Sequence, residues 1–390
     1  MVGKLKDIVK VSLPTTQTGR YPKPNWYNYN IRDRDWLEMY NEPGFLEAYT
    51  DAVRTTIIDH EVCGQDIVTD GCMRFDWGLG TIASWNTNSL AYVGGLRRVT
   101  GRPAGDVVMT GVVGKELAES YYRFKAWAKG SERNWWLAED LPSMGRLRLW
   151  VETAKIALAT STKPLKYSGP AAAMASYYTL NKTGKSDRDV FFGFAKAQNE
   201  MLRELVNVGC KIIQLDYPFG FTHWASNFSE VRKDAWDILI QGFNEEVKGV
   251  NAHIWVHFCF GAPILYNHEV APQTYHMAKA YPYMAECKAD CIQSEAANTD
   301  GKYLDEELKA WKEYLSDKDY AVGAVTPYDL LETAEDVDKI VEKSLKYVPP
   351  DKLALTSDEG LAAHGYLTRI GAMIKMRLLT DAAKKARKKI

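Results

Sequence analysis

Two residues with metal-binding side chains, His257 and Cys259, are separated by one residue within the apolar run 253–260. On a β-strand, residues i and i+2 point to the same side, so this imidazole and this thiolate can reach one metal ion. Zinc accepts both ligand types at about 2.0 to 2.3 Å. The short pattern alone also fits two buried structural side chains, so further ligands must decide between the two interpretations.

Further ligand-type side chains stand at the ends of other apolar runs. Glu295 ends the next run along the chain, and Glu359 follows the last one. With His257 and Cys259 they make a four-ligand site for one zinc ion geometrically possible. A free thiol has a pKa of about 8.5, and coordination to a divalent cation deprotonates it while leaving the sulfur nucleophilic. The pattern therefore points to alkyl transfer at sulfur.

The elements that must position these side chains are eight short apolar runs, with helical periodicity between most of them, as in 44–63, 191–208 and 334–347. The eight runs are 11–18, 67–71, 165–168, 211–216, 253–260, 289–295, 320–326 and 353–356. This alternation predicts an α/β fold, a closed (β/α)₈ TIM-type barrel with parallel strands. No Gly-x-Gly-x-x-Gly follows the first run, which disfavours a dinucleotide-binding fold.

In such a barrel the working residues lie at the carboxyl ends of the strands. Here those positions are Arg20, Cys72, Ser168, Asp216, His257 with Cys259, Glu295, Thr326, and Asp358 with Glu359. We expect a single barrel over residues 1–390, with an insertion at 72–163 after the second strand. The insertion is expected to form a β-ribbon plus helices near the barrel mouth, with strands over 104–113 and a helix over 117–129.

The composition narrows the function classes. The net charge is −1, from 49 basic and 50 acidic residues, which gives no electrostatic basis for nucleic-acid or membrane partners. No run approaches the roughly 20 apolar residues of a membrane helix, and residues 1–10 lack a signal core. Six scattered cysteines fit a reducing, cytoplasmic location. The basic run 384–389 fits a solvated, frayed helix end, with a docking tail as the alternative, and a homo-oligomer stays open.

The order of motifs resembles the catalytic C-terminal half of cobalamin-independent methionine synthase and its shorter single-barrel relatives. The resembling segments are 14–22 (PTTQTGRYP), 66–76 (DIVTDGCMRFD), 168–170 (SGP), 208–218 (VGCKIIQLDYP), 253–261 (HIWVHFCFG), 290–295 and 332–361. The resemblance implies a zinc enzyme that methylates the thiol of homocysteine from a methylated folate. It also implies His257, Cys259 and Glu295 as zinc ligands, and Asp216 as the carboxylate that holds the ammonium group of the amino acid.

Three positions depart from the family pattern. Glu359 stands where the family has its fourth zinc ligand, a cysteine, which makes the ligand set harder and leaves the identity of the metal open. Cys72 replaces a carboxylate that contacts the amino acid, and Arg20 replaces a serine beside its carboxylate. The family's proton-donating histidine has no counterpart in 324–328, and no counterpart of the folate-binding N-terminal half is expected.

Losing a carboxylate and gaining an arginine favour an acceptor thiol other than homocysteine, anionic and without an amino group. The first reading is a zinc-dependent methyl or alkyl transferase that takes a small-molecule thiol and a methyl or alkyl donor. The alternatives are a carbon–sulfur bond-forming enzyme or lyase similar to epoxyalkane:coenzyme M transferase, and a ligand-binding barrel that has lost its metal.

Ser168, Tyr217 and His223 complete the candidate site. Ser168 and Tyr217 are predicted to contact substrate with Arg20 and Cys72, and His223 is a candidate proton donor in the loop after the fourth strand. Arg74 and Asp76 are expected to pair at the rim, a pair that fits a structural role as well as a catalytic one. Asp216 as a helix cap and Cys72 as a small buried hydrophobe are the structural alternatives.

Overall fold

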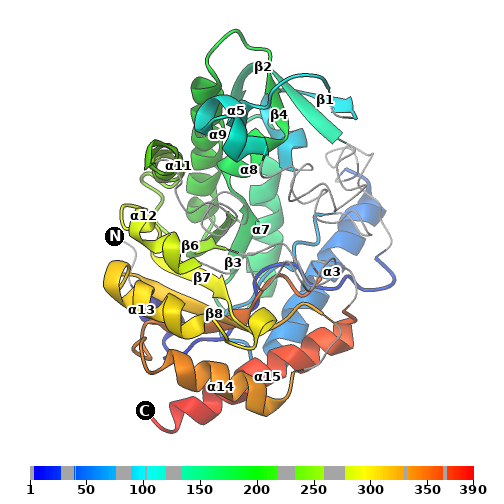
Figure 1. Cartoon of the computed structure of the whole chain (residues 1–390). Coiled ribbons are helices and arrows are strands. Elements are labelled where there is room, and N and C mark those ends of the chain that lie inside the picture. Colours follow the sequence, from blue (N-terminus) through cyan, green and yellow to red (C-terminus); the bar gives the residue numbers. More distant parts are fainter. Residues whose placement is uncertain are drawn as a thin grey trace.

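The computed structural model describes residues 4–27, 39, 41–75, 89–101, 103–119, 134–217, 233–258, 277–328, 332–362 and 367–390. Its centre is a six-stranded parallel sheet in the order β3-β5-β6-β7-β8-β9, of which Figure 1 labels β3, β6, β7 and β8. The strands are β3 (Lys166–Pro170), β5 (Ile212–Asp216), β6 (His253–His257), β7 (Cys291–Glu295), β8 (Asp319–Val325) and β9 (Leu353–Ser357). The strands β5 to β9 are buried along their length, as expected of strands covered on both faces, and in β3 only the last residue, Pro170, is partly exposed.

Two further segments close this sheet into a barrel. Thr15 forms a parallel bridge with Leu355 of β9, and Val68 forms one with Leu165 beside β3. The amides of Asp66 and Ile67 donate to the Thr15 carbonyl, which joins the two segments to each other. With these two segments the described chain contains the eight parallel positions of a TIM-type barrel, and the predicted fold class is confirmed.

Helices alternate with the strands and cover the outside of the barrel (Figure 1). They are α3 (Pro43–Val62), α7 (Arg148–Thr160), α8 (Ala172–Tyr177), α9 (Asp187–Asn207), α11 (Lys233–Glu246), α12 (Tyr281–Met284), α13 (Leu304–Tyr314), α14 (Ala334–Ser344) and α15 (Arg369–Arg387). α9 begins with a capping box, in which the Ser186 hydroxyl accepts from the Asp189 amide and the Asp189 carboxylate accepts from the Ser186 amide. No helix in the described parts of the chain is long and apolar enough to cross a membrane.

A short N-terminal helix, α1 (Leu5–Val9), fills the amino-terminal end of the barrel. Leu5 is buried in a small cluster separate from the main core. The other buried members come from six strand segments and are Ile67, Ile212, Trp255, Cys291, Ala321 and Ala354. Because these residues alternate with those that face the helices, they form the lowest layer of the barrel interior.

A second, small sheet combines two strands from the region after the second strand segment with one strand that follows β3. β1 (Gly94–Thr100) pairs antiparallel with β2 (Asn134–Ser143), and β2 pairs parallel with β4 (Thr179–Asn181). One expectation for this region is wrong, because α5 (Val108–Val113) is a helix where strands were predicted over 104–113. Val108, Met109, Val112 and Val113 are buried at helical spacing, so packing overrides the strand preference of valine. The helix expected over 117–129 falls mostly outside the described residues.

Candidate active site at the carboxyl rim of the barrel

His257 ends β6, and the parallel register pairs it with Asp216 of β5 and Gln293 of β7. Its imidazole is 3% exposed, and burial lowers its pKa to about 3, so the ring is neutral at physiological pH. The Nδ1 atom is buried without a hydrogen-bond partner among the described residues. A neutral imidazole with an unused ring nitrogen is the form that binds a metal ion.

The two glutamates lie at the same rim. Glu295 ends β7 next to β6, is buried, and accepts a hydrogen bond of 2.8 Å from Asn298 Nδ2. Glu359 follows β9 and is also buried, and its charge acts on the pKa values of both His257 and Asp216. The structure therefore brings Glu359 into the electrostatic neighbourhood of His257, although the two residues are 102 positions apart.

The predicted four-residue ligand set extends beyond what the structure describes, because Cys259 lies outside the described residues. His223, the candidate proton donor, lies outside them as well. Within the described part, no group of three or more His, Cys, Asp or Glu side chains is placed to hold a metal ion. The donor chemistry of the rim still fits a cation, since an unsatisfied imidazole nitrogen stands beside buried carboxylates. The metal-ligand roles therefore remain predictions.

Asp216 is buried at the carboxyl end of β5, on the strand next to His257. Burial raises its pKa to about 7, and the nearby charge of Glu359 acts in the same direction. Gln214 Nε2 donates to Asp216 Oδ1 at 2.7 Å, which fixes the orientation of the carboxyl group. A carboxyl group held in this way can pair with a cationic group of a ligand.

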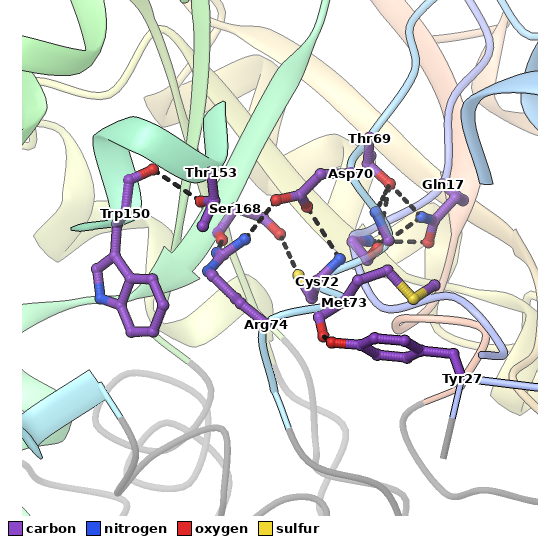
Figure 2. A network of polar contacts seen from close by, with 12 residues as sticks. Gln17, Tyr27, Thr69, Asp70, Cys72, Met73, Arg74, Trp150, Thr153 and Ser168 are labelled. Atoms are coloured by element: carbon purple, nitrogen blue, oxygen red, sulfur yellow. Dashed lines mark hydrogen bonds and ion pairs between the residues drawn. The ribbon is translucent and has the colours of Figure 1, made fainter. Parts of the chain in front are cut away.

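The end of the second strand segment forms a network of polar contacts, drawn in Figure 2. The Cys72 backbone has φ = 51°, in the left-handed region, and its amide donates to Asp70 Oδ1 at 2.9 Å. This turn directs the Cys72 Sγ atom to within 3.3 Å of Ser168 Oγ. Burial raises the pKa of the Cys72 thiol to about 11, so a neutral thiol occupies the position where the family pattern has a carboxylate.

Arg74 forms an ion pair with Asp70 at 2.5 Å and donates to the Ser168 carbonyl (Figure 2). Its guanidinium is fully buried against the rings of Phe75 and Tyr167, at 4.6 and 4.7 Å from their centroids. The partner of Arg74 in the described part of the chain is Asp70, four residues earlier. The predicted pairing of Arg74 with Asp76 stays a prediction, because Asp76 lies outside the described residues.

Arg20 lies at this end of the barrel, between two glycines that allow close packing of the backbone. Its neighbour Gly19 packs against Ser168, where an added Cβ atom would lie only 2.2 Å from Ser168 Oγ. Gly360 packs against Arg20 itself, where an added Cβ atom would lie 2.8 Å from Arg20 Cβ. The Ala362 amide donates to the Arg20 carbonyl, and the charge of Arg20 acts on the Cys72 thiol. Arg20, Cys72, Ser168 and the segment that carries Glu359 thus share one end of the barrel.

Tyr217 points away from this end. It follows Asp216, so its side chain lies on the opposite face of the strand. Its ring packs on Phe243 of α11 at 5.4 Å between centroids, and its hydroxyl donates to Glu246 Oε2 at 3.3 Å. This placement argues against the predicted substrate contact of Tyr217, because the helix layer takes both its ring and its hydroxyl.

One charged residue inside the barrel was missed by sequence reasoning. Lys166 begins β3, is 0% exposed, and its Nζ atom lies 4.6 Å from the ring centroid of Trp255. Burial lowers its pKa to about 7, and the nearby Asp216 opposes that effect. The sequence could have indicated this position, because Lys166 and Ser168 are two residues apart on one strand and therefore face the same side, the barrel interior.

Comparisons with known proteins agree with this geometry, although no protein-family profile matches the chain. The chain is 28% identical over 380 residues to a methionine synthase of Saccharolobus solfataricus, covering 97% of the chain and 96% of the relative. It is also 28% identical over 351 residues to a methionine synthase of Sulfolobus acidocaldarius, covering 90% and 86%.

Two solved structures support the same fold. A B12-independent methionine synthase from Shewanella sp. W3-18-1, in complex with selenomethionine, superposes with a TM-score of 0.73 at 22% identity, covering 97% of the chain and 99% of that structure. A methyltransferase from Methanosarcina mazei superposes with a TM-score of 0.56 at 12% identity, covering 96% and 94%. These two structures and the geometry described above define the fold as a (β/α)₈ barrel. Over nearly its whole length the chain is similar in sequence to methionine synthases.

Proposed function

We propose that this protein is a metal-dependent methyl or alkyl transferase that acts on a thiol other than homocysteine. The observation that carries the proposal is the buried, neutral His257, whose Nδ1 atom lacks a partner among the described residues and which lies within the influence of Glu359. An imidazole in this state would be costly in a purely structural core, because its unsatisfied nitrogen has lost its hydration.

The residues proposed to hold one zinc ion are His257, Cys259, Glu295 and Glu359. A bound divalent cation would supply Lewis acidity, which keeps the acceptor sulfur deprotonated and nucleophilic at neutral pH. The sulfur would then take the methyl or alkyl group from the donor, while the donor's leaving group keeps the bonding electron pair. The thiol proton leaves to solvent or to a basic group of the protein.

The acceptor is selected, in this proposal, by Cys72 and Arg20, which lie at the same end of the barrel as Asp216. The thiol of Cys72, which burial keeps protonated, carries no negative charge toward a ligand. Arg20 adds a guanidinium at the same end of the barrel, where it can bind a carboxylate or sulfonate bidentately. Compared with the family pattern, this rim has one negative group fewer and one cation more, which favours an anionic thiol over an amino-acid thiol.

Metal analysis of protein purified without added metal tests the proposal. We expect about one zinc per chain, lost in His257→Ala and in Glu359→Ala. His253→Ala is the matched control, because His253 is a second buried histidine on β6 that is committed to Asp319 and Trp255 through hydrogen bonds of 3.0 Å. Metal retained in His257→Ala, or wild-type protein without metal, would contradict the proposal and favour a ligand-binding barrel.

Product analysis then separates the transfer reactions. The zinc-loaded protein is incubated with homocysteine or 2-mercaptoethanesulfonate as acceptor, and with a methylated folate or a short epoxide as donor. We expect more S-alkylated 2-mercaptoethanesulfonate than methionine. The donor that yields this product, the methylated folate or the epoxide, distinguishes methyl transfer from epoxide opening. Methionine as the dominant product would overturn the assignment of the acceptor.

A further inference from the structure

The interior of the barrel below the rim contains a lysine that has no role in the proposed chemistry. Lys166 pairs in register with Ile212, two residues before Gln214 and four before Asp216 on the adjacent strand. Its ammonium lies over Trp255, a member of the lowest interior layer, which places Nζ inside the barrel beneath the rim. The side chain is therefore enclosed by the barrel and directed toward its axis.

The Lys166 ammonium group has no hydrogen-bond partner among the described residues. Two amide oxygens of the barrel interior, Gln214 Oε1 and Gln293 Oε1, are likewise buried and without a described partner. A buried ammonium group without a partner is costly to a fold, because desolvation is not repaid by hydrogen bonds. Such a lysine requires a compensating charge within the same low-dielectric interior.

Asp216 provides that charge. Among charged groups, Asp216 has the largest electrostatic effect on the pKa of Lys166. The charged groups that affect the pKa of Asp216 are Lys166, Glu359 and Arg74. Arg74 is already paired with Asp70, and Glu359 lies beside His257. Lys166 is thus the interior cation that remains for Asp216 among the described groups that act on it.

We propose that Lys166 determines acceptor specificity by supplying, from within the protein, the positive charge that an amino-acid substrate would otherwise bring to Asp216. The pair has zero net charge whether the proton lies on the amine or on the carboxyl group. An incoming ammonium group therefore finds no net negative charge at Asp216. The acceptor class that fits is a thiol or thioether with an anionic end and no ammonium group.

This inference rests on the proposed function, since it takes Asp216 as the group that would bind a substrate ammonium. Two probes differ only in that group: L-methionine and 4-(methylthio)butanoate share the thioether and the carboxylate, and only methionine has the ammonium. Binding is measured by titration calorimetry on the full chain, with added zinc and again with a chelator.

Wild-type protein is expected to bind 4-(methylthio)butanoate at least about tenfold more tightly than methionine. In Lys166→Met, which removes the charge and keeps the length of the side chain, methionine affinity is expected to rise at least about tenfold, so that the preference disappears or reverses. Lys166→Gln provides a second neutral variant in case the new side chain at position 166 packs poorly. In the double variant Lys166→Met/Asp216→Asn, the gain in methionine affinity should vanish.

A purely structural lysine gives a different pattern. Removing it would raise the melting temperature and leave the ratio of the two affinities unchanged, which would overturn the inference. A wild-type preference for methionine, or binding of neither probe, would overturn it as well. The affinity ratio requires no methyl donor and no turnover, whereas metal content and product analysis test the proposed function, so failure of one is distinguishable from failure of the other.

Discussion

Arg74 shows at the residue scale how the rim is held together. Its guanidinium is fully buried, its charge is balanced by Asp70, and its remaining surface is covered by aromatic rings. The Ser168 carbonyl accepts another of its hydrogen bonds, so Arg74 links the second strand segment to β3. The orientation of Cys72 and Ser168 toward one another depends on this link.

We expect Asp70→Asn to lower the free energy of unfolding by about 3–5 kcal/mol, because it leaves the Arg74 charge buried and unbalanced. Asp51→Asn is the matched control, since Asp51 pairs with Arg54 on the surface, with both side chains more than half exposed. That variant should change stability by less than about 0.5 kcal/mol. Equal effects of the two variants in urea denaturation would contradict the role assigned to the buried pair.

Sequence reasoning located most of the rim through one rule, that strand ends face the mouth of a barrel. It predicted that Asp216, His257 and Glu359 would share that end, and in the structure the charge of Glu359 acts on the pKa values of both Asp216 and His257. The parity of the strand also predicts that Tyr217 faces outward, which the motif resemblance obscured. Lys166 escaped notice because a single lysine within a short strand resembles an edge residue until the closed barrel shows that it is enclosed.

At the scale of elements, hydrophobic periodicity was sufficient for the strands and for the long helices. The predicted helices 44–63, 191–208 and 334–347 correspond to α3, α9 and α14. α5 was missed because its valine-rich sequence has strand propensity, and only its burial beside α9 selects the helix. The pairing of β1 with β2 depends on residues 34 or more positions apart, which local patterns do not specify.

Glu246, at the end of α11, ties together three elements. Its carboxyl group accepts hydrogen bonds from the amide of Ala172, at the start of α8, and from the hydroxyl of Tyr217, the residue after β5. Burial raises the pKa of Glu246 to about 8 from an ordinary value of 4.5. The folded protein therefore holds this proton over a pH range in which the unfolded chain releases it.

The sign of the resulting pH effect follows from linkage. The protonated Glu246 adds to the free energy of unfolding, and this stabilisation is fully present below about pH 4.5. It is lost as the pH rises through about 8, at up to about 1.4 kcal/mol per pH unit. Glu246→Gln, which is neutral at every pH, should remove this decline. The measurement is urea denaturation of both proteins from pH 5 to pH 8.5, with Glu245→Gln on the adjacent surface as control. A constant difference between wild type and Glu246→Gln across this range would refute the prediction.

At the scale of the whole molecule, the last helix holds the first strand segment in place. Arg387 of α15 donates to the carbonyls of Ser12 and Leu13 and pairs with Asp66 at 2.5 Å. Asp66 also accepts from the Thr15 amide at 3.0 Å. Two basic neighbours of Arg387 form ion pairs with Asp338 and Glu342 of α14. Arg387 therefore packs against the barrel, while Lys385 and Lys389 remain more than half exposed, as expected of a solvated helix end.

Arg387→Ala is expected to lower the free energy of unfolding by about 1.5–3 kcal/mol, since it removes charge-assisted hydrogen bonds at the point of closure. Lys388→Ala is the control, because Lys388 is an exposed neighbour in the same turn. Hydrogen exchange should quicken at the amides of Thr16 and Ile67, which join the first strand segment to its two neighbours. Unchanged exchange at these amides would show that the barrel closes without Arg387.

The helix α1, which carries Leu5 into the lowest layer of the barrel, has a consequence for traffic. Because packed side chains fill this end of the barrel, a small molecule can reach the rim residues only from the carboxyl side of the strands. Under the proposed function, donor and acceptor then enter and leave on one side of the molecule. The acceptor, which is proposed to bind next to Asp216, is therefore expected to bind before the donor.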